Sequence, residues 1–167
     1  MKRALLASLA LLPAMAVTLI STPAAVAVHR TVDSESGSAQ TAAEALDAQQ
    51  EKTPGRVVGN RIYYPDGEVF VAVDAGTLSI GQCSSGQLCL WSFSNYSGSF
   101  SYKTGSGVTR TISTSVGSFY NNRSNAARLY SNTGASSVCY GPGAQLASVS
   151  SSYNSPAKVY LSATSSC

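Results

Sequence analysis

The fold is decided by one stretch, Cys83-Ser84-Ser85-Gly86-Gln87-Leu88-Cys89-Leu90-Trp91-Ser92-Phe93-Ser94-Asn95-Tyr96-Ser97-Gly98. It holds two cysteines six residues apart around a Ser-Ser-Gly turn, followed by the apolar run from Leu88 to Trp91. A turn followed by such a run predicts a hairpin that enters a β-strand. At its end, the pattern predicts a fold-over in which an aromatic ring covers Gly98, a glycine that needs positive φ.

This stretch resembles two known patterns. An aromatic residue followed by Tyr96-Ser97-Gly98 is similar to the folded hairpin of a βγ-crystallin Greek key. The run from Cys83 to Trp91 resembles the opening of the secreted peptidase-inhibitor family typified by an actinobacterial metalloproteinase inhibitor. Tyr140-Gly141-Pro142-Gly143-Ala144-Gln145-Leu146 is close to a Pro-Gly-Ala-Gln-Leu run of that inhibitor. The resemblance covers about residues 83–167 and implies an all-β, βγ-crystallin-like double Greek-key sandwich.

All four cysteines, Cys83, Cys89, Cys139 and Cys167, lie in this part of the chain. An even number in an exported protein favours two disulfides over free thiols, and four cysteines allow three pairings. The family pattern implies Cys83–Cys89, which leaves Cys139–Cys167. A zinc site is disfavoured, because the one histidine is His29 and no pair of Cys-x-x-Cys spacings exists.

The remaining chain divides into three segments. Residues 1–27 combine a basic start, an apolar run and a small-x-small motif, which predicts a secretion signal; a retained membrane anchor is the alternative. Residues 28–55 predict a disordered or weakly helical linker with a capping box at Thr41–Glu44. The pattern of residues 56–82 predicts a β-hairpin extension that turns at Pro65-Asp66-Gly67. These three segments precede residues 83–167, the predicted crystallin-like inhibitor-family domain.

Within that domain, short strand-like runs alternate with Gly- and Ser-rich turns, which is typical of an antiparallel sandwich. We expect strands at residues 88–93, 99–103, 108–113, 127–131, 137–140, 145–149 and 158–162. A degraded repeat relates Phe119–Asn122 to Ser152–Ser155. It predicts two Greek keys that begin at the strands of Cys89 and Cys139, the second key being compressed.

Charged residues are unevenly distributed. Every acidic residue lies at or before Asp74, and the later part of the chain carries five basic residues, which we interpret as ordinary solvation of a secreted domain. Five dispersed charges fall short of a nucleic-acid-binding stripe. With no carboxylate after Asp74 and no histidine after His29, neither a serine nucleophile with its base nor a carboxylate pair is available, so the sequence predicts no enzyme and no catalytic residue.

Calcium is the metal to consider, because crystallin-like keys often bind it through an Asn/Asp-Asn/Asp-x-x-Ser/Thr-Ser motif. Asn121, Asn122 and Ser124 are weak candidates, but Asn125-Ala126 follows where hydroxyl residues are expected. Calcium prefers charged oxygen ligands, and Arg123 would repel the ion. The sequence therefore predicts no metal and no cofactor.

The resemblance implies a secreted proteinaceous inhibitor, with metallopeptidases as its targets, that acts by inserting a loop into the active-site cleft. The corresponding loop is shorter here and lacks a second cysteine; it comprises Asn132, Thr133, Gly134, Ala135, Ser136, Ser137 and Val138. The alternative is a non-inhibitory extracellular crystallin-like structural or interaction protein, with or without bound calcium. The expected partner is a secreted peptidase. We expect the protein to be a monomer. It should bind no nucleic acid and, after signal removal, no membrane.

Overall fold

A computed structural model describes residues 40–167, which belong to one compact unit. The predicted signal segment and the first part of the predicted linker lie outside the described residues. Among the described residues, no helix has the length and apolar character needed to cross a membrane. The described chain is mostly β, with one short α-helix and two antiparallel sheets, which confirms the predicted all-β sandwich class.

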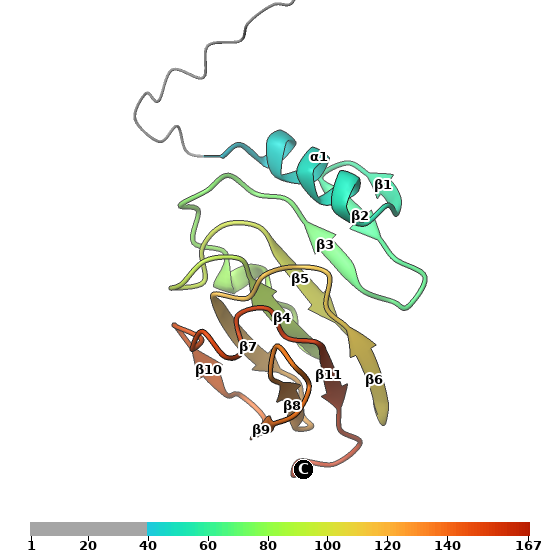
Figure 1. The fold of residues 1–167 in the computed structure, drawn as a ribbon, viewed down its shortest axis with the longest axis vertical. Helices are drawn as coiled ribbons and strands as arrows, with labels where there is room; N and C mark the ends of the chain where they lie inside the picture. The colour runs from blue at the N-terminus through green and yellow to red at the C-terminus, as the bar shows by residue number, and fades with distance from the viewer. Residues whose placement is uncertain (1–39) are drawn as a thin grey trace, which may run out of the picture. The chain divides into compact units, whose positions relative to one another are not determined.

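The larger sheet has seven strands (Figure 1). In spatial order they are β1 (Arg56–Val58), β2 (Arg61–Tyr63), β3 (Val69–Val71), β5 (Phe100–Lys103), β4 (Gln87–Trp91), β7 (Ser118–Asn122) and β10 (Gln145–Leu146). The smaller sheet has four strands in the order β6 (Val108–Thr111), β11 (Lys158–Leu161), β8 (Ala127–Tyr130) and β9 (Ser137–Tyr140). The short 3-10 helix η1 (Ile80–Gln82) precedes β4.

The strand order shows an exchange between two groups of four consecutive strands, β4 to β7 and β8 to β11. Strands β4, β5 and β7 of the first group share the large sheet with β10, whereas β6 joins β8, β9 and β11 in the small sheet. Strand β8 therefore opens the second group. Our prediction that residues 127–131 belong to the first key, with the second key beginning at Cys139, is wrong in this respect. Sequence analysis also missed β7, whose asparagines are poor strand formers.

Alternation along β4 explains why its run Leu88 to Trp91 is apolar throughout. Leu88 and Leu90 face the small sheet and pack with Phe119, Leu129 and Val159 in the main core. Cys89 and Trp91 point to the opposite face of the large sheet, into a second cluster with Phe100. Because successive strand residues point to opposite faces, a strand covered on both sides has no polar position.

Helix α1 (Ala42–Lys52) begins at the predicted capping box, in which the Thr41 hydroxyl accepts a hydrogen bond from the Glu44 N–H and the Glu44 carboxylate accepts from the Thr41 N–H. Ala42, Ala45 and Leu46 pack on a third apolar cluster of the large sheet, formed by Ile62, Phe70 and Ala72. The described part of the predicted linker is thus folded against the sheet. Strands β2 and β3 form the predicted hairpin around Gly67, which has φ +85°.

Both implied disulfides are present. Cys83 is bonded to Cys89 and Cys139 to Cys167, each pair with its Cα atoms 5.9 Å apart. The predicted fold-over is confirmed as well: Gly98 has φ +73°, and a Cβ placed on it would lie 2.4 Å from the ring of Phe93. The first disulfide closes the turn before β4, and the second ties β9 to the C-terminal residue of the sequence.

Candidate functional site

The candidate loop connects β8 to β9 within the small sheet. Tyr130 and Ser137 are register partners at the two ends of this hairpin. The loop therefore lies inside the second group of strands. A second key that began at the strand of Cys139, as the repeat suggested, would have placed the loop between the two keys. Its position differs because β8 belongs to the second group, so the connection that follows it turns within one sheet.

Asn132 fastens the loop to the segment before β11. Its backbone N–H donates to the Ser152 carbonyl (2.9 Å), and its side-chain Nδ2 donates to the Ser151 carbonyl (2.8 Å). Its Oδ1 accepts from the Ser155 N–H at 2.9 Å. Its Nδ2 also donates to the Asn154 Oδ1 at 3.2 Å. One exposed asparagine thus makes four hydrogen bonds to a neighbouring loop, which restrains the turn.

The tip of the loop is a compact turn. Gly134 has φ +75° and donates from its N–H to the Ser131 carbonyl at 2.8 Å, while the Ser131 N–H donates to the Ser136 carbonyl. The Ser131 hydroxyl also accepts from the Ser136 N–H. Because residues 131–136 satisfy one another's backbone groups, the extended part of the candidate loop is confined to its last two residues, Ser137 and Val138.

Strand β9 is an edge strand of the small sheet, paired on one side by β8. Val138 is opposite Leu129 but remains 38% exposed, because β9 has no second neighbour among the strands of residues 40–167. The disulfide at Cys139 fixes the middle of the strand. At its end, the Tyr140 ring packs edge-on against Phe119 with ring centroids 4.4 Å apart, and burial raises the pKa of Tyr140.

The asparagine segment uses its side-chain N–H donors internally. The Asn121 side chain is fully buried, and its Nδ2 lies within hydrogen-bonding distance of the carbonyls of Asn125, Tyr140 and Gly141. Asn122 donates to the Cys83 carbonyl and accepts from the Tyr120 hydroxyl.

The guanidinium of Arg123 donates to three further carbonyls, those of Gly105, Ala126 and Ser162, at 2.7–2.9 Å. Burial lowers the pKa of Arg123. Ser124 is exposed. In the described part of the chain, no group of three His, Cys, Asp or Glu residues could hold a metal ion.

We expect calcium to change the stability of the protein little. The backbone carbonyls around Asn121 and Arg123 already accept hydrogen bonds. The buried Asn121 Oδ1 accepts none from the described residues, but it is a single neutral oxygen, and a guanidinium close to a site opposes a divalent cation. An ion that binds only the folded state at 100 times its Kd would add about 2.7 kcal/mol, a clear rise in melting temperature. Melting in millimolar calcium and in a chelator tests this, and a rise of several degrees with calcium would contradict it.

A buried ion pair, which sequence analysis missed, joins the N-terminal extension to the inhibitor-like domain. The Nζ of Lys103 lies 2.5 Å from the Glu68 carboxylate, and both side chains are 3% exposed or less. Lys103 also donates to the Thr111 carbonyl. Burial lowers the pKa of Lys103, and Glu68 opposes that shift.

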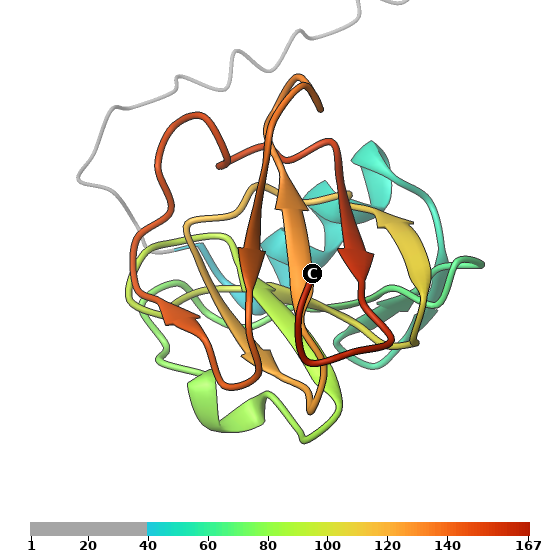
Figure 2. The ribbon, with the colours of Figure 1, turned by 90° about the horizontal axis from the view of Figure 1, so that it is seen from below.

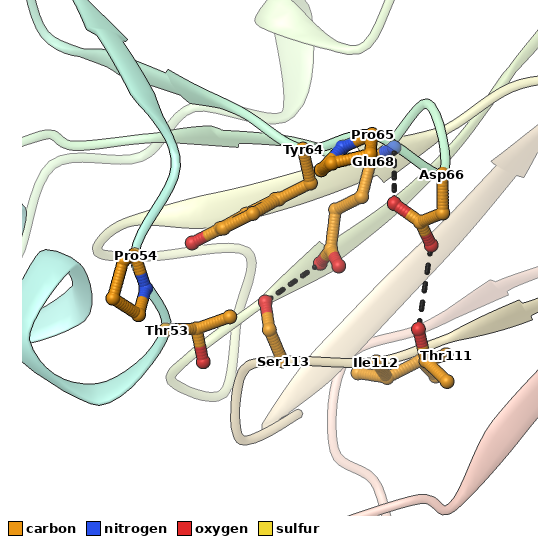
Figure 3. A pocket seen from close by; sticks show the side chains of 9 residues that line it. All are labelled: Thr53, Pro54, Tyr64, Pro65, Asp66, Glu68, Thr111, Ile112 and Ser113. Carbon is orange, nitrogen blue, oxygen red and sulfur yellow. Dashed lines mark hydrogen bonds between the residues drawn. The ribbon is translucent and has the colours of Figure 1, made fainter.

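A surface cavity of about 440 Å³ is lined in part by Glu68 (Figure 3). In it, the Ser113 hydroxyl donates to Glu68 at 3.0 Å, and Asp66 accepts from the Glu68 N–H and from the Thr111 hydroxyl. Tyr64 forms one wall, and burial raises its pKa. Both carboxylates thus form hydrogen bonds within the protein. These bonds attach the turn between β2 and β3 to the end of β6.

A comparison with family models matches residues 79–141, from the approach to β4 through β9, to peptidase inhibitor family I36. No curated protein and no solved structure gave a match. The family match supports a non-enzymatic peptidase inhibitor with a peptidase as its partner. Residues 79–141, less than half of the chain, are therefore similar to peptidase inhibitor family I36.

Proposed function

We propose that the protein is a secreted inhibitor of metallopeptidases that presents Ser137 and Val138 at the open edge of β9 to the active-site cleft. The family match supports inhibition of a peptidase. The metallopeptidase class and the loop rest on the sequence resemblance. Secretion rests on the predicted signal segment and agrees with the two disulfides.

The observation that carries this site is the free edge of β9. An edge strand presents unpaired N–H and C=O groups, which can pair with an extended strand of a partner, while side-chain pockets of that partner provide specificity. Val138 is the one large apolar side chain of the candidate loop and is partly exposed. It is therefore the side chain best suited to fill an apolar pocket of the peptidase.

Preorganisation supports inhibition over cleavage. The bonds of Asn132, the turn at Gly134 and the Cys139–Cys167 disulfide hold the loop before binding. A loop that is already ordered loses little conformational entropy when it binds. The same restraints keep the two sides of any cleaved bond together, which slows product release.

We expect Val138→Asp to weaken inhibition by at least about 30-fold. This corresponds to a loss of about 2 kcal/mol of binding free energy, which is typical when a central side chain of an interface is removed. The variant should fold, because Val138 is partly exposed at an edge. Thermolysin, subtilisin and chymotrypsin are titrated with the mature protein, and inhibition constants are compared with melting temperatures.

Val57→Asp is the matched control. Val57 is also an exposed valine on an edge strand, 44% exposed on β1 of the large sheet. The Val57→Asp variant should inhibit the peptidase as strongly as the wild type does. Failure of the wild type to inhibit any of these peptidases would refute the function, inhibition of the serine peptidases alone would refute the target class, and equal inhibition by the Val138 variant would refute the site.

A further inference from the structure

The five basic residues after Asp74 separate into two kinds in the structure. Lys103 and Arg123 are buried and bound by Glu68 or by backbone carbonyls, and Arg110 is half-buried beside Val159 on the inner side of β6. The other two, Arg128 and Lys158, lie together on the outer side of the small sheet. The two of these five basic residues that point away from the interior therefore lie on one face.

We define the outer face as the residues of the small sheet that alternate with its core positions: Thr109, Thr111, Arg128, Tyr130, Ser137, Cys139, Lys158 and Tyr160. Strands β9, β8, β11 and β6 lie side by side in Figure 2. Arg128 is the register partner of Tyr160, and the Nζ of Lys158 lies 4.7 Å from the centre of the Tyr130 ring. The two cations and two tyrosines thus form one contiguous group.

The composition of the outer face is that of an interface. Tyrosine and arginine are enriched where proteins bind one another, because each offers a large contact area and a polar group. Arg128 is oriented by the Ser137 hydroxyl (3.3 Å) and by the Cys167 carbonyl (3.0 Å). No acidic residue occurs after Asp74. Asp66, which accepts from Thr111, borders the outer face at β6, the edge of the small sheet opposite β9.

We propose that the outer face is a second contact surface for the inhibited peptidase and binds an acidic surface beside the active-site cleft. The proposal rests on the proposed function, since β9 carries both Val138 and the border of the outer face. A peptidase that pairs with the edge of β9 comes close to Arg128, the register partner of Cys139. Opposite charges across such a surface increase the association rate more than they change the dissociation rate.

The test compares Lys158→Glu/Arg128→Glu with Arg56→Glu/Arg61→Glu. Both double variants change the net charge equally, but the control lies on β1 and β2 of the large sheet. Association rate constants for the peptidase inhibited by the wild type are measured from progress curves. At about 0.02 M salt, we expect the outer-face variant to associate about tenfold more slowly. At about 0.5 M salt the difference should fall below about twofold, because screening shortens the range of the charges.

Lys158→Glu alone provides a second variant, because Arg128 also orients neighbouring groups, and it should show a smaller loss with the same salt dependence. Equal slowing by the control, or an unchanged rate in the outer-face variant, would overturn this proposal and leave inhibition intact. If the variants lose binding to heparin, a polyanion, but associate with the peptidase normally, the proposal is also wrong. If the wild type inhibits no peptidase, the proposed function and this proposal fail together.

Discussion

Replacing Glu68 with leucine is expected to lower the free energy of unfolding by about 3–5 kcal/mol, because the buried ammonium of Lys103 loses its anionic partner. Lys103 is fully buried on β5 and faces the same side as Leu88, its register partner. Water therefore cannot replace the carboxylate. The expected fall in melting temperature is about 10–20 °C, measured by thermal and urea unfolding.

A double-mutant cycle separates the ion pair from the packing. Lys103→Met alone leaves Glu68 buried without its cation, whereas Glu68→Leu combined with Lys103→Met removes both charges. Replacing both partners of a buried pair by apolar residues is often nearly neutral, so the double variant should be more stable than either single variant. Additive losses would show that the two side chains stabilise the fold independently.

The pH dependence of the Glu68→Leu variant provides a further check. Burial lowers the pKa of Lys103, and without Glu68 the pKa should fall further. Between this lower pKa and that of the unfolded chain, about 10.4, the unfolded state binds more protons, so stability rises with pH. The variant should regain stability as the pH is raised from 7 to about 9.5, below the ordinary tyrosine pKa of about 10. A loss independent of pH would identify packing as its cause.

Local patterns predicted most of the elements and none of the long-range charge pairing. The capping box at Thr41, the turn at Gly67 and the fold-over at Gly98 each depend on a few neighbouring residues, and all three are present. Lys103 and Glu68 are far apart in the sequence, and a charged side chain in a strand is normally exposed. Neither residue gives a local signal that the other is its partner.

The inhibitory role of the candidate loop stays a prediction, but its place in the topology differs from the one the repeat suggested. The repeat suggested that the second group of strands begins at Cys139, whereas it begins one strand earlier at β8. Strand exchange between sheets is a non-local property, and sequence periodicity does not report it. The restraints on Asn132 were invisible for the same reason, because its partners lie about twenty residues further along the chain.

The second large effect is expected from removing helix α1. A chain beginning at residue 40 should be as stable as one beginning at residue 28, whereas a chain beginning at Arg56 should lose about 2–4 kcal/mol of unfolding free energy. The second truncation uncovers Ile62 and Phe70, which are 3% exposed or less, and removes the hydrogen bond from Gln49 to Tyr64.

The expected loss distinguishes a structural helix from a removable linker. Although α1 is short and only weakly apolar, a helix that is marginal alone is stabilised by the sheet it covers, and it covers that sheet in return. Leu46→Ala in the full chain is the milder control and should lose about 1 kcal/mol, because Leu46 is only partly buried. Urea unfolding of the three chains measures the effect. Equal stability of the chain beginning at Arg56 would mean that the sheet tolerates exposure of Ile62 and Phe70, and that the domain begins at β1.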